Sequence, residues 1–119
     1  MSGLVADVLV DTDIFIDHLR GAAEFRPRGH RVSYSVITRA ELYAGNSASA
    51  VVNRLLSPFR ELPVDRFVAQ RAGRIRRETG TRLPDALIAA TAIEHGLSIV
   101  TRNRSDFAKV RGLRLRNLV

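Results

Sequence analysis

Cysteine is absent from this 119-residue chain. Its absence excludes disulfide bonds, thiolate zinc sites and cysteine nucleophiles, so a metal ion would have to be held by oxygen atoms or by histidine. Long apolar runs are also missing, because no stretch approaches the roughly 20 residues that a membrane-spanning helix needs. Residues 1–10 show no cationic segment followed by a cleavable apolar stretch. We therefore expect a cytoplasmic protein without a membrane partner.

Repeats and low-complexity linkers are lacking too. The composition, with 45% hydrophobic and 26% charged residues, is that of an ordinary globular protein. A chain of this length fits one compact domain with one hydrophobic core. We expect residues 1–119 to form a single domain.

Basic residues outnumber acidic ones by 19 to 12, which gives a net charge of +7, and 18 of the basic residues are arginine. Such an excess favours a polyanionic partner, most simply a nucleic acid. Arginine can also reflect genome composition, and scattered arginines often form only a solvated surface. The charge therefore supports nucleic-acid binding without establishing it.

Strand-like and helix-like segments alternate along the chain. The nearly continuous apolar run at residues 5–10 is typical of a strand buried on both faces. Further strands are predicted at 31–34, 97–101 and 113–118. Helices are predicted at 14–19, at 36–44, within 46–62, at 66–79 and at 85–95, with a brief helical turn at 106–109. This alternation predicts an α/β fold, a three-layer α/β/α sandwich with a mainly parallel central sheet.

The helix expected between Asp65 and Gly80 is strongly amphipathic. One side carries Phe67, Val68, Ala72 and Ile75, and most of its arginines lie on the other side. That polar side could meet a phosphate backbone.

Four acidic residues lie near predicted strand ends: Asp11, Glu41, Asp85 and Asp106. Ligands of parallel sheets bind at the carboxyl ends of the strands. At about 4 Å, each carboxylate pair would cost roughly 1 kcal/mol in water and about 4 kcal/mol at an effective dielectric of 20, so a cation is needed. Oxygen ligands favour Mg²⁺ or Mn²⁺, and such ions can activate water for attack on a phosphodiester, leaving a 5′-phosphate and a 3′-hydroxyl.

Each acid also has a simpler interpretation, apart from Glu41. Asp11 could cap the following helix, Asp85 could favour its helix dipole, and Asp106 could be an N-cap. Glu41 lies two turns into a helix, beside the apolar stripe, where no capping role exists. Its presence together with the other three favours a metal site.

Four segments resemble the ordered acidic motifs of PIN domains: residues 10–17, 38–45, 83–92 and 101–107. Their order and spacing across nearly the whole chain resemble the VapC toxins of bacterial toxin–antitoxin pairs. The resemblance implies a Mg²⁺- or Mn²⁺-dependent endoribonuclease whose metal site is formed by the four acids named above.

The resemblance also implies roles for their neighbours. Thr12 and Asp13 lie beside the site, and Asp13 either adds a carboxylate or caps the first helix. Thr101 and Asn103 would orient Asp106 or a metal-bound water. The candidate substrate-binding residues, for which solvated surface charge is the alternative, are Arg82, Arg102 and Arg104. The histidines have no spacing typical of a metal pair.

The resemblance further implies three partners: a cognate antitoxin that obstructs the acidic cleft, a second copy of the chain in a homodimer, and an RNA substrate, which is tRNA, ribosomal RNA or messenger RNA. Apolar residues around Phe15 and at 55–59 could serve the core or such interfaces. A phosphoacceptor receiver domain fits poorly, since Lys109 follows Asp106 instead of ending a strand. The other alternative is a non-catalytic RNA- or protein-binding module on the same fold.

Overall fold

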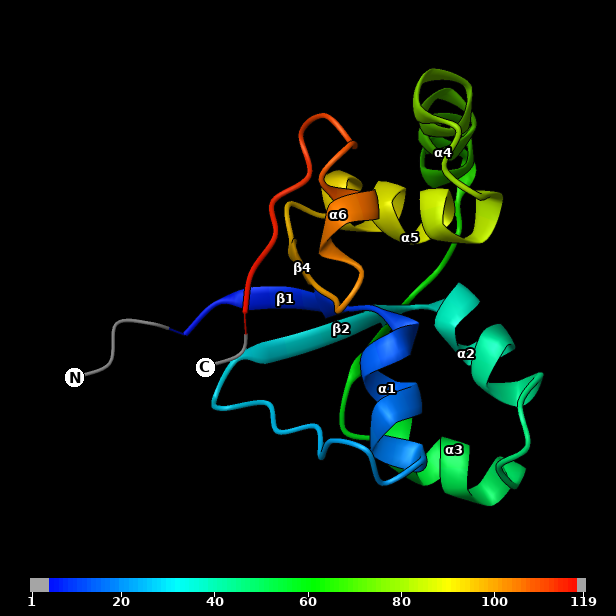
Figure 1. Cartoon of the computed structure of the whole chain (residues 1–119), viewed down its shortest axis with the longest axis vertical. Helices are drawn as coiled ribbons and strands as arrows, with labels where there is room; N and C mark the ends of the chain where they lie inside the picture. The colour runs from blue at the N-terminus through cyan, green and yellow to red at the C-terminus, as the bar shows by residue number, and fades with distance from the viewer. Residues whose placement is uncertain (1–4, 118–119) are drawn as a thin grey trace.

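The computed structural model describes residues 5–117. Its four-stranded sheet has the order β3-β2-β1-β4, and all three pairings are parallel (Figure 1). The strands are β1 (Asp7–Val10), β2 (Arg31–Ser35), β3 (Arg60–Leu62) and β4 (Ser98–Val100). In register, Val8 of β1 lies opposite both Val32 of β2 and Ser98 of β4.

Helices cover both faces of the sheet (Figure 1). The helices are α1 (Thr12–Leu19), α2 (Val36–Tyr43), α3 (Ser49–Leu56), α4 (Arg66–Thr79), α5 (Leu83–Glu94) and α6 (Arg104–Phe107). Val8 and Val10 pack into one core cluster with residues of α1, α2 and α3, whereas Leu9 packs into a second cluster with α4, α5 and α6. β1 is therefore buried on both faces, and the predicted three-layer α/β fold is confirmed.

The helix starts follow from short polar side chains. Ser35 and Asp65 cap α2 and α4 by accepting hydrogen bonds from the backbone N–H groups of Ile37 and Val68. Gly80 ends α4 at φ +75°, a conformation that favours glycine. These boundaries agree with the sequence. α5 and α6 each begin two residues before the predicted starts, at Leu83 and Arg104.

The strands differ from the prediction in two places. Residues 60–62, where no strand was predicted, form edge strand β3 after α3 has ended at Leu56, two residues before Pro58. Only Leu62 of this strand is buried, so it has no apolar pattern to reveal it. In place of the strand predicted at 113–118, the described residues show a single bridge between Ile99 and Leu115, after a turn at Gly112 with φ +85°. Leu118 lies outside the described residues.

The predicted position of Phe67 is also wrong, since its side chain is 65% exposed. α4 packs against α5 through Val68, Ala72 and Ile75, and Phe67 lies about 100° around the helix from Val68. By contrast, Phe15 is fully buried and makes edge contacts with other aromatic rings, so it serves the core and not an interface. Within residues 5–117, no helix is long and apolar enough to cross a membrane.

Gly73 provides a test of how α4 is stabilised. It lies in the middle of the helix on the exposed side, and an added Cβ would meet no atom within 4 Å. Gly73→Ala should raise the free energy of unfolding by about 0.5–1 kcal/mol, because glycine loses more backbone entropy than alanine. Urea denaturation measures this.

The matched control is Gly80→Ala, where φ is +75° and a side chain is strained. It should lower the free energy of unfolding. A stabilising Gly80→Ala, or a destabilising Gly73→Ala, would contradict this description of α4.

Candidate active site

Asp11 lies directly after β1 at the carboxyl edge of the sheet. Its side chain is only 5% exposed. One carboxylate oxygen accepts a hydrogen bond from the Thr12 backbone N–H at 2.8 Å, and the other accepts one from Thr101 Oγ1 at 2.8 Å. The pairing of β1 with β4 brings Thr101 to this position from 90 residues away. Asp11 therefore caps α1 and belongs to the acidic cluster at the same time.

Asp13 extends this cluster from the first turn of α1. Its Oδ2 accepts hydrogen bonds from Thr101 Oγ1 at 3.3 Å and from the Arg102 backbone N–H at 3.1 Å. Its Oδ1 is buried and accepts no hydrogen bond from any described residue. A buried carboxylate oxygen without a donor is unfavourable unless a water or cation satisfies it.

Glu41 faces the same edge from α2 and is half-buried. Thr12 Oγ1 donates a hydrogen bond of 2.7 Å to Glu41 Oε1 and lies 2.9 Å from Thr38 Oγ1. Glu41, which lies beside the apolar stripe of α2, thus has Thr12 of α1 as its hydrogen-bond partner. Thr38, which lies three residues before Glu41 on the same helix face, is a contributor that the sequence prediction missed.

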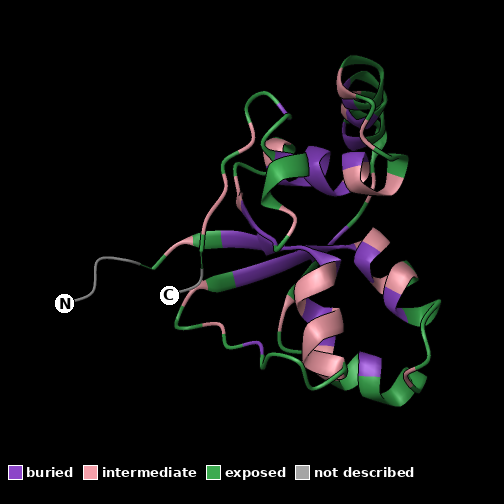
Figure 2. Ribbon diagram, viewed as in Figure 1, coloured by how far each residue is buried: buried purple, intermediate pink, exposed green. Residues whose placement is uncertain are grey.

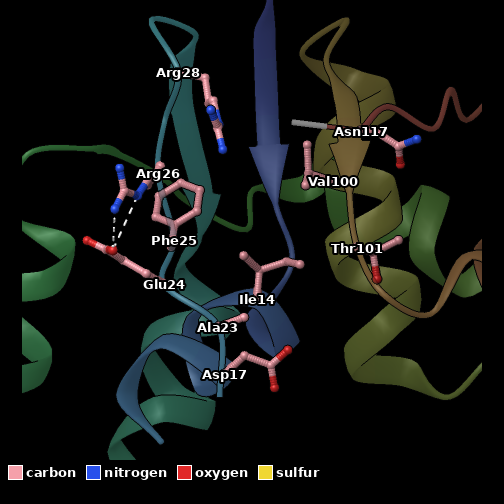
Figure 3. A pocket seen from close by; sticks show the side chains of 10 residues that line it. All are labelled: Ile14, Asp17, Ala23, Glu24, Phe25, Arg26, Arg28, Val100, Thr101 and Asn117. Atoms are coloured by element: carbon pink, nitrogen blue, oxygen red, sulfur yellow. Dashed lines mark hydrogen bonds and ion pairs between the residues drawn. The ribbon is translucent and has the colours of Figure 1, made fainter. Parts of the chain in front are cut away.

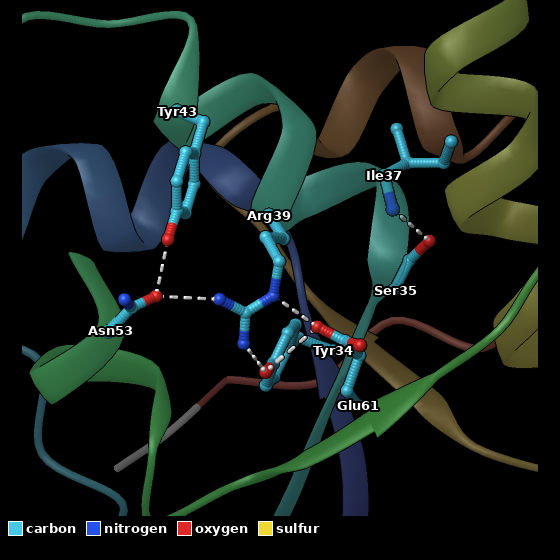
Figure 4. Close-up of polar contacts among 7 residues, drawn as sticks. All are labelled: Tyr34, Ser35, Ile37, Arg39, Tyr43, Asn53 and Glu61. Carbon is cyan, nitrogen blue, oxygen red and sulfur yellow. Dashed lines mark hydrogen bonds and ion pairs between the residues drawn. The ribbon is translucent and has the colours of Figure 1, made fainter. Parts of the chain in front are cut away.

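A polar network holds α2 in this orientation from its other side (Figure 4). The Arg39 guanidinium donates hydrogen bonds to Glu61 Oε1 at 2.5 Å, Tyr34 Oη at 3.0 Å and Asn53 Oδ1 at 2.8 Å. The contacts with Glu61 and then Tyr34 raise the pKa of Arg39, and the three contacts together join α2 to β2, β3 and α3. Tyr43 adds a hydrogen bond of 2.6 Å to the same Asn53 oxygen.

Asp85 and Asp106 lie in a polar pocket of about 120 Å³. Its other lining residues are Thr79, Gly80, Thr81, Arg82 and Lys109. Asn103 Nδ2 donates to Asp106 Oδ2 at 2.9 Å, and Lys109 Nζ lies 3.9 Å from Asp106 Oδ1. Asp106 lies within the first turn of α6, so the N-cap role that was its simpler interpretation belongs to Asn103.

The carboxylates affect one another electrostatically. Burial, and then the charge of Asp13, raise the pKa of Asp11 to about 7 despite the opposing hydrogen bonds from Thr101 and Thr12, and Asp85 adds to the rise. Burial is also the largest cause that raises the pKa of Asp85. The charges of Glu41, Asp106 and Asp13 raise it further, while Arg82 lowers it. The fold thus gathers all four predicted acids, and Asp13, at one edge.

A divalent cation fits this donor set. The mutual repulsion and the unsatisfied Asp13 oxygen are features that positive charge relieves. Among residues 5–117, no three acidic or histidine side chains converge closely enough to hold one ion in the present conformation. Asp106 is exposed and Glu41 and Asp85 are half-buried, so solvent reaches all three carboxylates.

The three candidate substrate-binding arginines have different surroundings. Arg82 lines the pocket of Asp85 and is exposed. Arg102 forms an ion pair with Asp17, with Nε 2.7 Å from Oδ2, and Arg104 donates a hydrogen bond of 2.9 Å to Asn117. Arg82 therefore has the position best suited to contact a phosphate beside the acids.

Asp17 and Thr101 also line a separate pocket of about 330 Å³ with Phe25 and Arg28 (Figure 3). None of the four acids lines it. Nearby, the Nδ1 atoms of His18 and His30 accept hydrogen bonds from the backbone N–H groups of Phe25 and Ala6. These two histidines thus anchor the segment between α1 and β2.

The family model of the PIN domain matches residues 8–113. The chain belongs to the PIN-domain family. It is 38% identical over 109 residues to a protein of Mycobacterium tuberculosis named Ribonuclease VapC10, with 81% of this chain and 82% of that protein covered. It is 34% identical over 113 residues to Ribonuclease VapC19 of the same organism, with 83% and 90% covered. These relatives assign the chain to the VapC branch of PIN domains.

Solved structures agree. A toxin–antitoxin complex from Klebsiella pneumoniae contains a chain with 30% identity and a TM-score of 0.72, and the match covers 93% of this PIN domain and 99% of that chain. A chain in the DNA-bound VapBC of Salmonella typhimurium has 26% identity and a TM-score of 0.79, with 96% and 98% covered. The topology and the sequence thus lead to the same family.

The raised pKa of Asp11 predicts how stability depends on pH when divalent cations are removed. Folding raises this pKa from an ordinary value near 3.8 to about 7, so the folded state binds the proton more tightly than the unfolded state between these values. In EDTA, the contribution of Asp11 to the free energy of unfolding should therefore fall as the pH rises from about 4 to 7, by a few kcal/mol at most.

Asp11→Asn should flatten this decline, because asparagine caps the helix but does not ionise. Chemical denaturation of both proteins at a series of pH values measures the difference. Equal slopes for the two proteins would contradict a raised pKa at Asp11.

Proposed function

We propose that this PIN domain is a Mg²⁺- or Mn²⁺-dependent endoribonuclease that acts as the toxin of a toxin–antitoxin pair. The observation that carries the proposal is the buried Asp11 carboxylate, surrounded at the carboxyl edge of the sheet by Asp13, Glu41, Asp85 and Asp106. The relatives named as ribonucleases support the same activity.

Asp11, Glu41, Asp85 and Asp106 would hold the cation. A bound Mg²⁺ or Mn²⁺ lowers the pKa of water and neutralises charge on a phosphodiester. The water oxygen bonds to phosphorus, the bond from phosphorus to the 3′ oxygen breaks, and a proton reaches that oxygen, which leaves a 5′-phosphate and a 3′-hydroxyl.

The surrounding side chains orient these acids. Thr101 holds Asp11 through its hydroxyl, Thr12 holds Glu41, and the Asn103 amide holds Asp106. Arg82, in the pocket of Asp85, attracts the substrate phosphate by its positive charge. These hydrogen bonds restrict the orientations of three of the four acids.

The partner proposed for the acidic edge is a cognate antitoxin, since the related structures include toxin–antitoxin complexes. A pocket of about 210 Å³ between α1 and α2 has Glu41 in its wall, together with Ile16, Leu19 and Leu42. A peptide seated there would have apolar contacts and would reach the acids, where a basic side chain could replace the cation. The toxin is proposed to form a homodimer as well.

Incubation of the purified protein with total RNA tests the activity. Mg²⁺ or Mn²⁺ should produce discrete cleavage products with 5′-phosphates, and EDTA should abolish them. Asp11→Asn and Asp85→Asn should each reduce the rate by at least about 100-fold, because each removes a proposed metal ligand. Sequencing of the RNA ends gives the cleavage positions.

Arg54→Gln is the control, since Arg54 is exposed on α3 and should leave cleavage unchanged. Cleavage that persists in EDTA or in Asp11→Asn would contradict the proposed mechanism. Absence of cleavage of any cellular RNA would favour a non-catalytic binding module.

Metal binding can be tested without substrate. Millimolar Mn²⁺ should raise the melting temperature of the wild-type protein at pH 7, because a ligand of the folded state shifts the unfolding equilibrium. The shift should largely disappear in Asp11→Asn and persist in Arg54→Gln. An equal shift in all three proteins would place the cation elsewhere.

A further inference from the structure

The outer face of α4 is not used by the function proposed above. We define the α4 arginine face as Arg66, Phe67, Gln70, Arg74 and Arg77. All five residues are exposed, whereas Val68, Ala72 and Ile75 are buried, and Figure 2 shows α4 with both exposed and buried positions. Arg66, Gln70, Arg74 and Arg77 follow one another at helical spacing, so they lie along one side of the helix.

Within residues 5–117, the side chains of the arginines on this face have no hydrogen-bond or ion-pair partner. α4 carries five arginines. Arg71 is paired with Glu94, and Arg76 donates hydrogen bonds to the backbone oxygens of Gly80 and Thr81. Among the described residues, Arg66, Arg74 and Arg77 make no hydrogen bond or ion pair, and the one acid of the helix, Glu78, forms no ion pair either.

Part of this charge arrangement is unfavourable for the helix itself. Arg66 occupies the first helical position, where the helix dipole disfavours a cation, although the N-cap Asp65 lies beside it and the dipole favours Arg77 in the last turn. Arg74 and Arg77 are like charges three residues apart, a spacing at which they repel. Polyanion binding would compensate for both effects.

Phe67 identifies which polyanion fits. It is the most exposed of the large hydrophobic side chains, at 65%, and it lies beside Arg74 and Arg71 on the helix surface. An exposed aromatic ring among arginines is the arrangement on which unpaired bases stack while the arginines contact phosphates. A second copy of this chain fits poorly, because two such faces would bring arginines against each other.

The face also leads to the acidic site. α4 ends at the Thr79–Arg82 segment, which lines the pocket of Asp85 and Asp106, and Arg77 lies in the last turn before it. Arg66 lies eleven residues earlier, a rise of about 16 Å along the helix. Only residues 78–81 separate Arg77 at one end of the face from Arg82, which lines the pocket of the acids.

We propose that the α4 arginine face binds a single-stranded stretch of the RNA substrate, with a base stacked on Phe67 and phosphates on Arg66, Arg74 and Arg77. This inference rests on the proposed ribonuclease function, to which it adds a binding surface beyond the cleavage site. RNA with unpaired nucleotides next to the cut is the substrate class it predicts.

Phe67→Trp in an Asp11→Asn background provides a direct reporter, because the chain has no tryptophan and this variant should not cleave RNA. A short single-stranded oligouridylate should quench the fluorescence saturably, since a stacked base quenches indole. Val51→Trp in the same background is the matched control, because Val51 is exposed on α3 and outside the face. Its fluorescence should not change.

Charge removal separates this face from general attraction to RNA. Arg74→Gln/Arg77→Gln should lower the magnitude of the slope of log affinity against log salt by roughly 1.4, at about 0.7 per lost single-strand phosphate contact. Arg54→Gln/Arg60→Gln loses the same charge away from the face and should retain the slope. Phe67→Ala should weaken oligouridylate binding about tenfold, and Phe67→Tyr should restore it.

Equal quenching of both tryptophan variants, or equal slopes for both double variants, would overturn the inference. Fluorescence of the Phe67→Trp variant that changes with protein concentration alone would assign the face to a second copy of the chain and overturn it as well. The ribonuclease proposal can fail independently of this inference. Saturable quenching without RNA cleavage by the wild-type protein would contradict the ribonuclease proposal. Cleavage without quenching would contradict only the proposal that the α4 arginine face binds RNA.

Discussion

Burial of the Asp11 carboxylate at the end of β1 is the constraint on which the site depends. A charged group in this position is tolerated only with strong compensation, and two hydrogen bonds from Thr12 and Thr101 supply part of it. They do not supply enough, because the pKa of Asp11 is raised to about 7. The residue that caps α1 is therefore a buried negative charge that a nearby positive charge would stabilise. The neighbouring carboxylates make that negative charge still less favourable.

The parallel sheet explains how residues distant in the sequence come to lie around Asp11. β1 lies inside the sheet and is buried on both faces, so Asp11 lies where the strand reaches the carboxyl edge of the sheet. β4 lies beside it and brings Thr101, while β2 leads into α2 and places Glu41 on the other side. The Arg39 network (Figure 4) holds α2 from its outer side, and Glu41 and Thr38 contact Thr12 on its inner side.

Local chemistry made much of this fold predictable from sequence. Ser35, Asp65 and Gly80 act within a few residues of their own positions, which is why their roles could be inferred. Phe67 was wrongly predicted to be buried and edge strand β3 was not predicted, because the burial of both depends on which helix or strand lies alongside. In the site, the four acids could be proposed from their sequence motifs. The contacts of Thr12 with Thr38 and Glu41 join residues 26 and 29 positions apart, so they could be seen only in the structure.

We propose that a cation neutralises the carboxylates around Asp11, and titration of the Asp11 side-chain carboxyl carbon by NMR tests this proposal most directly. In EDTA, the titration midpoint should lie near 7, and saturating Mg²⁺ should move it to lower pH, because a bound cation stabilises the ionised form. A midpoint near the ordinary aspartate value of about 3.9, unchanged by Mg²⁺, would contradict the account.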